Sequence, residues 1–92
     1  MKIVINTCMG GFSLSEQAQQ LLGCNCYGYL ATQEQPISRA DPRLVALVDQ
    51  LGPAAAGVLA ALKIVEIPEG VQWFIMEENG QEWVAEQHRI WD

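Results

Sequence analysis

The sequence predicts an α+β fold, with an antiparallel sheet of about four strands and two helices packed on one face, in the order β-α-α-β-β-β. Runs rich in β-branched and aromatic residues indicate the strands. These runs are residues 2–8, 62–67, 71–78 and 81–87. Between the first and second runs, two stretches place apolar residues at helical spacing. The 92 residues are half apolar and 17 % charged, so we expect a single domain, residues 1–92, with one core.

The first strand and the first helix are predicted from residues 2–23. The stretch KIVINTC (residues 2–8) is followed by a Gly-Gly pair, which is typical of a strand that enters a tight turn. Ser13 and Glu16 have the spacing of a capping box, which places the start of a short amphipathic helix at Ser13, and Gly23 is suited to end it. The side chains expected to face the core are Leu14, Ala18, Leu21 and Leu22.

The second helix is predicted to begin at Asp41-Pro42. An Asp side chain caps the first free amides, and Pro needs no hydrogen bond at the first helical position. Gly52-Pro53 marks the end of this helix. Its core face is expected to comprise Leu44, Leu47, Val48 and Leu51.

Two segments give no single prediction of secondary structure. Residues 24–40 lack a sustained period and contain Gly28 and Pro36, which indicates a surface excursion with an extended piece around residues 27–30. Residues 53–61 are compatible either with a further helical turn or with a close-packed connection of small residues.

A β-hairpin is predicted at the C-terminal end, because Asn79-Gly80 separates two strand-like runs and favours a type I′ turn. With these two residues as the loop, the cross-strand pairs are Glu78 with Gln81, Glu77 with Glu82, Met76 with Trp83, Ile75 with Val84, Phe74 with Ala85, and Trp73 with Glu86. Side chains alternate between the two faces of a hairpin. The face expected to enter the core carries Phe74, Met76, Trp83 and Ala85. The face expected to be exposed carries Trp73, Ile75, Val84, Glu77, Glu82 and Glu86.

The charge is unevenly distributed along the chain. Eleven acidic residues against five basic ones give a net charge of −6. Residues 1–65 contain four acids and four bases, whereas residues 66–92 contain seven acids and one base. This surplus argues against direct binding to DNA or RNA phosphates and favours a basic protein partner.

Two interpretations fit the acidic hairpin. Opposed glutamates, such as Glu77 and Glu82, destabilise a hairpin by about 0.2 to 1 kcal/mol, which suggests that they serve an interface rather than the fold. Alternatively, the acids only keep a solvated edge strand from aggregating. Under the first interpretation, the partner-binding residues are Glu77, Glu78, Glu82, Glu86 and Trp73.

Metal and covalent chemistry are poorly supported by the sequence. Cys8, Cys24, Cys26 and His88 do not have the paired spacing of a structural zinc site, so we expect reduced thiols, no metal and no cofactor. A Cys and a His without a third orienting group do not define a catalytic site, so we expect no enzyme activity. No apolar run is long enough to span a bilayer, and no signal-peptide pattern is present, so we expect a cytoplasmic protein that does not bind membranes.

A small-ligand site is the alternative function that the sequence offers. The Gly10-Gly11 turn joins a strand to a helix start, and such turns can present backbone amides to an anion. Asn6, Thr7 and Ser13 lie nearby, but the Lys of a phosphate-binding loop is missing. The other interpretation is a tight turn that needs glycine for conformational reasons.

Three motifs resemble a group of small phage and prophage proteins. They are KIVINTC with GGFSLSE (residues 2–8 and 10–16), DPRLVALVDQLG (residues 41–52), and VEIP with EWVAEQHRIW (residues 65–68 and 82–91). The resemblance covers most of the chain except about residues 24–37 and 53–60, and Met9 stands where the group commonly has an aromatic residue. The motifs of this group define no catalytic residues.

Within this phage group, the length, acidity and composition are similar to a small anti-CRISPR protein that acts on type I-F systems. The resemblance implies a monomeric, stoichiometric inhibitor in the host cytoplasm. Its partner would be the host CRISPR-Cas surveillance complex, that is, protein subunits with bound crRNA, and it would block recognition of target DNA without binding DNA itself. A phage structural subunit, which would self-assemble, is a further alternative.

Overall fold

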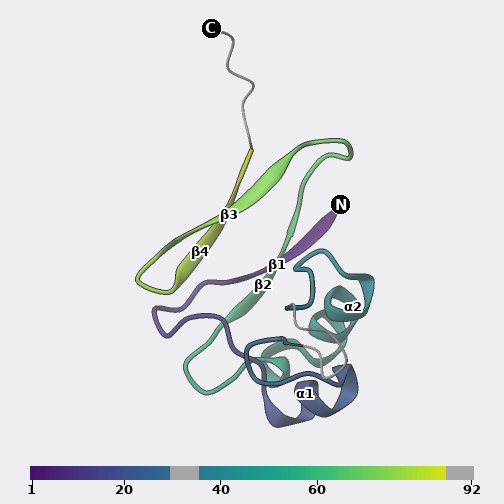
Figure 1. Ribbon diagram of the computed structural model, residues 1–92, viewed down its shortest axis with the longest axis vertical. Helices are drawn as coiled ribbons and strands as arrows, with labels where there is room; N and C mark the ends of the chain where they lie inside the picture. The colour runs from purple at the N-terminus through teal and green to yellow at the C-terminus, as the bar shows by residue number, and fades with distance from the viewer. Residues whose placement is uncertain (30–35, 87–92) are drawn as a thin grey trace, which may run out of the picture.

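The computed structural model describes residues 1–29 and 36–86, which form an α+β fold (Figure 1). The predicted order of strands and helices is confirmed. The elements are β1 (Lys2–Asn6), α1 (Glu16–Leu22), α2 (Pro42–Leu51), the 3-10 helix η1 (Gly52–Ala55), β2 (Leu62–Glu66), β3 (Trp73–Glu78) and β4 (Gln81–Glu86). The segment after α2, for which the sequence left two possibilities open, therefore begins as a turn of 3-10 helix. Gln87 of the last predicted strand lies outside the described residues.

The strands form two antiparallel pairs, β1 with β2 and β3 with β4, rather than the predicted single sheet of about four strands. The outer edge of β1 explains the difference. The Val4 N–H donates to the Arg39 carbonyl at 2.8 Å, and the Asn6 N–H donates to the Glu82 carboxylate at 2.8 Å. These bonds occupy the positions that a β4 backbone ladder would need, although β4 still contacts β1.

The β1–β2 pair lies between the helices and the β3–β4 hairpin (Figure 1). Helix α2 packs on β1 and β2, and α1 packs on α2 and η1, so both helices lie on one side of this pair, as predicted. Their core comprises Val4, Leu14, Ala18, Ile37, Leu44, Leu47, Val48 and Ala55. Ile3 and Ile5, which alternate with Val4 along β1, are also buried, so both faces of β1 are covered.

Helix α1 begins two residues later than predicted. The N-cap is Ser15, whose Oγ accepts from the Ala18 N–H at 3.3 Å and donates to the Ala54 carbonyl at 2.6 Å. Ser13 instead contributes its carbonyl to the Gly57 N–H. Gly23 ends the helix with φ 69°, as predicted, but Leu21 is 62 % exposed and lies outside the core.

Replacing Ser15 with alanine is expected to lower the free energy of unfolding by about 0.5 to 2 kcal/mol, because the cap of α1 is lost. Urea denaturation followed by circular dichroism measures this change. Ser13→Ala is the matched control. Its free energy of unfolding should stay within about 0.5 kcal/mol of the wild-type value, because Ser13 accepts the Gly57 hydrogen bond through its backbone carbonyl, which alanine keeps. A larger loss for Ser13→Ala than for Ser15→Ala would contradict this assignment of the cap.

Helix α2 begins as predicted. The Asp41 side chain accepts from the Arg43 N–H at 2.8 Å, and Pro42 occupies the first helical position. The side-chain hydrogen bond from Arg43 is the main cause that lowers the pKa of Asp41 below its usual value. Of the predicted core face, Leu44, Leu47 and Val48 are buried and Leu51 is half-buried.

The long connection before α2 is only partly a surface excursion. Tyr29 forms an isolated antiparallel bridge with Pro36, which matches part of the predicted extended piece, and Leu30 lies outside the described residues. Ile37 is 4 % exposed and belongs to the core. No sequence pattern predicted this contact, because a single isoleucine has no periodicity.

Candidate functional site

The β3–β4 hairpin has the predicted register and turn. Each cross-strand pair, from Trp73 with Glu86 to Glu78 with Gln81, is observed. Asn79 and Gly80 have φ angles of 53° and 89°, as a type I′ turn requires. The local signals in this segment were therefore sufficient to define the hairpin itself.

The two faces of the hairpin are the reverse of the prediction. The outer face exposes Phe74, Met76 and Trp83, with exposed fractions of 41, 43 and 41 %. On the inner face, Trp73, Ile75 and Val84 are half-buried, and the Glu82 side chain is only 9 % exposed. The prediction that Phe74, Met76 and Trp83 enter the core is wrong.

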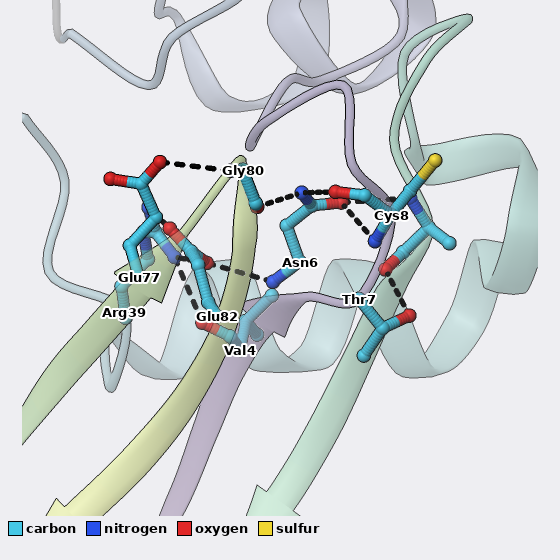
Figure 2. A network of polar contacts seen from close by, with 9 residues as sticks. Val4, Asn6, Thr7, Cys8, Arg39, Glu77, Gly80 and Glu82 are labelled. Carbon is cyan, nitrogen blue, oxygen red and sulfur yellow. Dashed lines mark hydrogen bonds and ion pairs between the residues drawn. The ribbon is translucent and has the colours of Figure 1, made fainter.

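Arg39 explains why a carboxylate lies on the inner face. Its guanidinium binds both carboxylate oxygens of Glu82, at 2.6 and 2.9 Å (Figure 2). The guanidinium carbon of Arg39 also lies 3.7 Å from the centroid of the Phe12 ring, on which it stacks. A paired and hydrogen-bonded carboxylate tolerates burial, whereas an unpaired one does not. Arg39 is 43 residues away in the sequence, so no local pattern revealed this ion pair.

The opposed glutamates are therefore accounted for by the fold. Glu82 pairs with Arg39, and Glu77 accepts a hydrogen bond from the Gly80 N–H at 2.9 Å (Figure 2). Both carboxylates therefore contribute to the fold, so their opposition is not evidence for an interface.

A buried asparagine joins the hairpin turn to the end of β1 (Figure 2). Asn6 is fully buried, and its Nδ2 donates to the carbonyls of Cys8 at 2.6 Å and Gly80 at 2.7 Å. Its Oδ1 accepts from the N–H groups of Ala61 at 2.9 Å and Cys8 at 3.3 Å. Every side-chain hydrogen-bonding position of Asn6 is thus occupied by the backbone, and Asn6 has no polar group left for a ligand.

Polar groups in and near the Gly10-Gly11 turn are also hydrogen-bonded within the protein. The Gly11 N–H points to the Cys8 carbonyl at 3.4 Å, and the Thr7 hydroxyl donates to the Ala61 carbonyl at 3.0 Å. A Cβ at Gly10 would collide with the backbone of Leu59, so the glycine is needed for close packing. These contacts support the interpretation of a tight turn more than that of an anion site.

The three cysteines are half-buried thiols. Burial, with a smaller contribution from Cys26, raises the pKa of the Cys24 thiol, which makes this thiol less reactive at neutral pH. Within residues 1–29 and 36–86, no three His, Cys, Asp or Glu residues are placed to hold a metal ion. His88 lies outside the described residues.

The predicted partner-binding residues divide into two groups. Glu77, Glu78 and Glu86 are exposed, and no contact within the described part of the chain forms an ion pair with any of them. Glu82 is in the buried ion pair and Trp73 is half-buried, so neither presents an open surface. The outer-face residues Phe74, Met76 and Trp83 were missed because alternation defines two faces without showing which one is buried.

Comparisons with protein-family models, curated proteins and solved structures found no match for this chain. Among the described residues, no helix has the length and apolar character that a membrane crossing requires.

Proposed function

We propose that this protein is a non-enzymatic inhibitor that binds a basic protein surface through the outer face of the β3–β4 hairpin. The observation that carries the proposal is the exposure of Phe74, Met76 and Trp83 on one side of a two-stranded ribbon. Large apolar side chains that gather on an exposed face are typical of protein interfaces, and Trp is enriched among the residues that dominate binding energy.

The negative charge of the hairpin indicates that the partner surface is positively charged. Glu78 lies on the outer face with Met76 and Phe74, because the three residues alternate along β3. Strands β3 and β4 together contain Glu77, Glu78, Glu82 and Glu86 and no basic residue. With Glu82 neutralised by Arg39, three exposed carboxylates remain on the hairpin to attract Lys and Arg side chains on a partner. Glu78 is on the outer face, whereas Glu77 and Glu86 alternate onto the inner face and are exposed there.

The resemblance to phage proteins supplies a specific partner, the type I-F surveillance complex in the host cytoplasm. Such complexes hold guide RNA and target DNA in positively charged channels. A compact acidic monomer with apolar anchors fits a role as a plug in such a channel. Its bound position would exclude target DNA by occupying Lys and Arg side chains that otherwise contact phosphates.

The test titrates wild-type protein and variants against purified type I-F surveillance complex and measures both binding and target-DNA recognition. The double variant Phe74→Ser with Trp83→Ser should bind at least about tenfold more weakly, as expected for central apolar anchors. Glu78→Lys with Glu86→Lys should slow association, and this difference should shrink as salt is raised.

Leu21→Ser is the matched control, because Leu21 is an exposed leucine on α1 and should leave binding unchanged. Thermal melting establishes that each variant is folded. Equal inhibition by the wild type and the Phe74 and Trp83 double variant would rule out the hairpin face. No binding of the wild type would rule out this partner.

A further inference from the structure

Three turns meet at one end of the strands, and we call this region the loop end. The turns comprise residues 8–11, 57–60 and 79–80, and they lie along the left side of Figure 1. The Gly11 N–H bonds the Cys8 carbonyl in the first turn, and the Ala60 N–H bonds the Gly57 carbonyl in the second. The third is the type I′ turn of the hairpin. Segments that are far apart in the sequence thus form one surface.

The loop end is held together by close backbone contacts. A Cβ at Gly10 would collide with Leu59, and a Cβ at Gly80 would collide with the Met9 carbonyl. Asn6 bonds Cys8, Ala61 and Gly80, and so ties the three turns to one buried side chain (Figure 2). Such pinned turns lose little conformational entropy when a partner binds them.

The loop end presents apolar side chains that the core does not use. Met9 and Leu59 are 67 and 66 % exposed, and Val58 is fully exposed at 101 %. The neighbouring segments 7–13, 56–61 and 77–81 contain two acids, Glu77 and Glu78, and no Lys or Arg. The surface therefore combines fixed apolar projections with negative charge on one side.

We propose that the loop end docks into an apolar pocket with a basic rim on a partner protein, with Val58 and Leu59 as its anchors. This inference rests on the proposed function, because the hairpin turn makes the loop end continuous with the outer face of the hairpin. A second copy of the chain is a poorer occupant, since it would bring Glu77 and Glu78 against the same carboxylates. An anionic membrane surface would also repel them.

The first arm of the test measures binding to the purified type I-F surveillance complex. Val58→Ser with Leu59→Ser should weaken binding at least about tenfold, with an unchanged melting temperature because both side chains are exposed. Leu21→Ser, a change at a leucine of nearly equal exposure on α1, should bind as the wild type does. If the Val58 and Leu59 variant binds as tightly as the wild type does, the loop end is not the docking surface.

The second arm does not depend on that complex. An amphipathic peptide of leucine and lysine is titrated into isotope-labelled protein, and the shifted amide signals are mapped by NMR. Shifts concentrated at Met9, Val58 and Leu59 support the proposal, and a leucine and glutamate peptide of the same pattern should cause none. Shifts confined to the hairpin face, or none with the lysine peptide, overturn it.

The two arms separate the two proposals. If wild-type protein fails to bind the surveillance complex, the proposed partner fails, and the peptide arm alone decides whether the loop end binds apolar basic surfaces. Sedimentation velocity tests the remaining alternative, in which a second copy of the chain binds the loop end. A dimer that dissociates when Val58 and Leu59 are replaced would overturn the proposal in favour of self-association.

Discussion

Replacing Asn6 with alanine is expected to lower the free energy of unfolding by about 2 to 4 kcal/mol, because several buried or partly buried backbone groups lose their partners together. The carbonyl of Gly80 and the N–H of Ala61 are two of these groups. A domain of this size has a total stability on the order of 5 to 15 kcal/mol, so this one side chain contributes a large part of it. Urea denaturation followed by tryptophan fluorescence measures the change.

Thr7→Ala is the matched control for Asn6→Ala. Thr7 is exposed and donates one side-chain hydrogen bond to the Ala61 carbonyl, so its loss should cost less than about 1 kcal/mol. Asn6→Asp keeps the acceptor oxygen but loses the donors to Cys8 and Gly80, and it should also be strongly destabilised. If Asn6→Ala is no more destabilising than Thr7→Ala, Asn6 does not hold the three turns together.

Local signals in the sequence were enough to predict most individual elements. Asp41 and Pro42 define the start of α2, and Asn79 with Gly80 defines the hairpin and its register. In each case the cause lies within a few residues of its effect, either as a cap or as a turn that needs positive φ. Such features do not depend on the rest of the fold.

The errors concern contacts between distant segments. The cap of α1 was predicted at Ser13, but the observed cap is Ser15, whose hydroxyl also donates a hydrogen bond to the distant Ala54 carbonyl. The predicted four-stranded sheet failed because Arg39 and Glu82 occupy the edge of β1. The same ion pair explains why the buried and exposed faces of the hairpin were predicted the wrong way round. Arg39, the partner of Glu82, comes from the connection before α2, far away in the sequence.

The acidic surplus in the C-terminal segment indicated the hairpin as a candidate interface. Of its predicted residues, Glu77, Glu78 and Glu86 are exposed. Hydrophobicity alone could not locate the apolar anchors, because both faces of the hairpin carry large apolar residues. Tertiary packing decides between such faces, and here an ion pair selects the face that also carries charge.

Replacing Glu82 with glutamine is also expected to lower the free energy of unfolding by about 2 to 4 kcal/mol, because it leaves the Arg39 guanidinium without its counter-charge in a partly buried site. The Glu82 and Arg39 side chains are only 9 and 22 % exposed, so solvent cannot fully replace the lost interaction. The hairpin should also become looser, since Glu82 accepts the Asn6 N–H and so connects β4 to β1. Urea denaturation gives the free energy of unfolding, and amide hydrogen exchange at Asn6, whose N–H donates to Glu82, shows whether the hairpin stays attached to β1.

The exposed ion pair between Arg43 and Asp41 provides the matched control. The Arg43 side chain is 62 % exposed, and Arg43→Gln should cost less than about 1 kcal/mol, as exposed pairs usually do. Arg39→Gln combined with Glu82→Gln should cost less than the sum of the single changes by at least about 1 kcal/mol, because the second change removes a charge that the first has already left unpaired. Additive losses, or a Glu82→Gln effect as small as that of Arg43→Gln, would show that the ion pair does not fix the inner face of the hairpin.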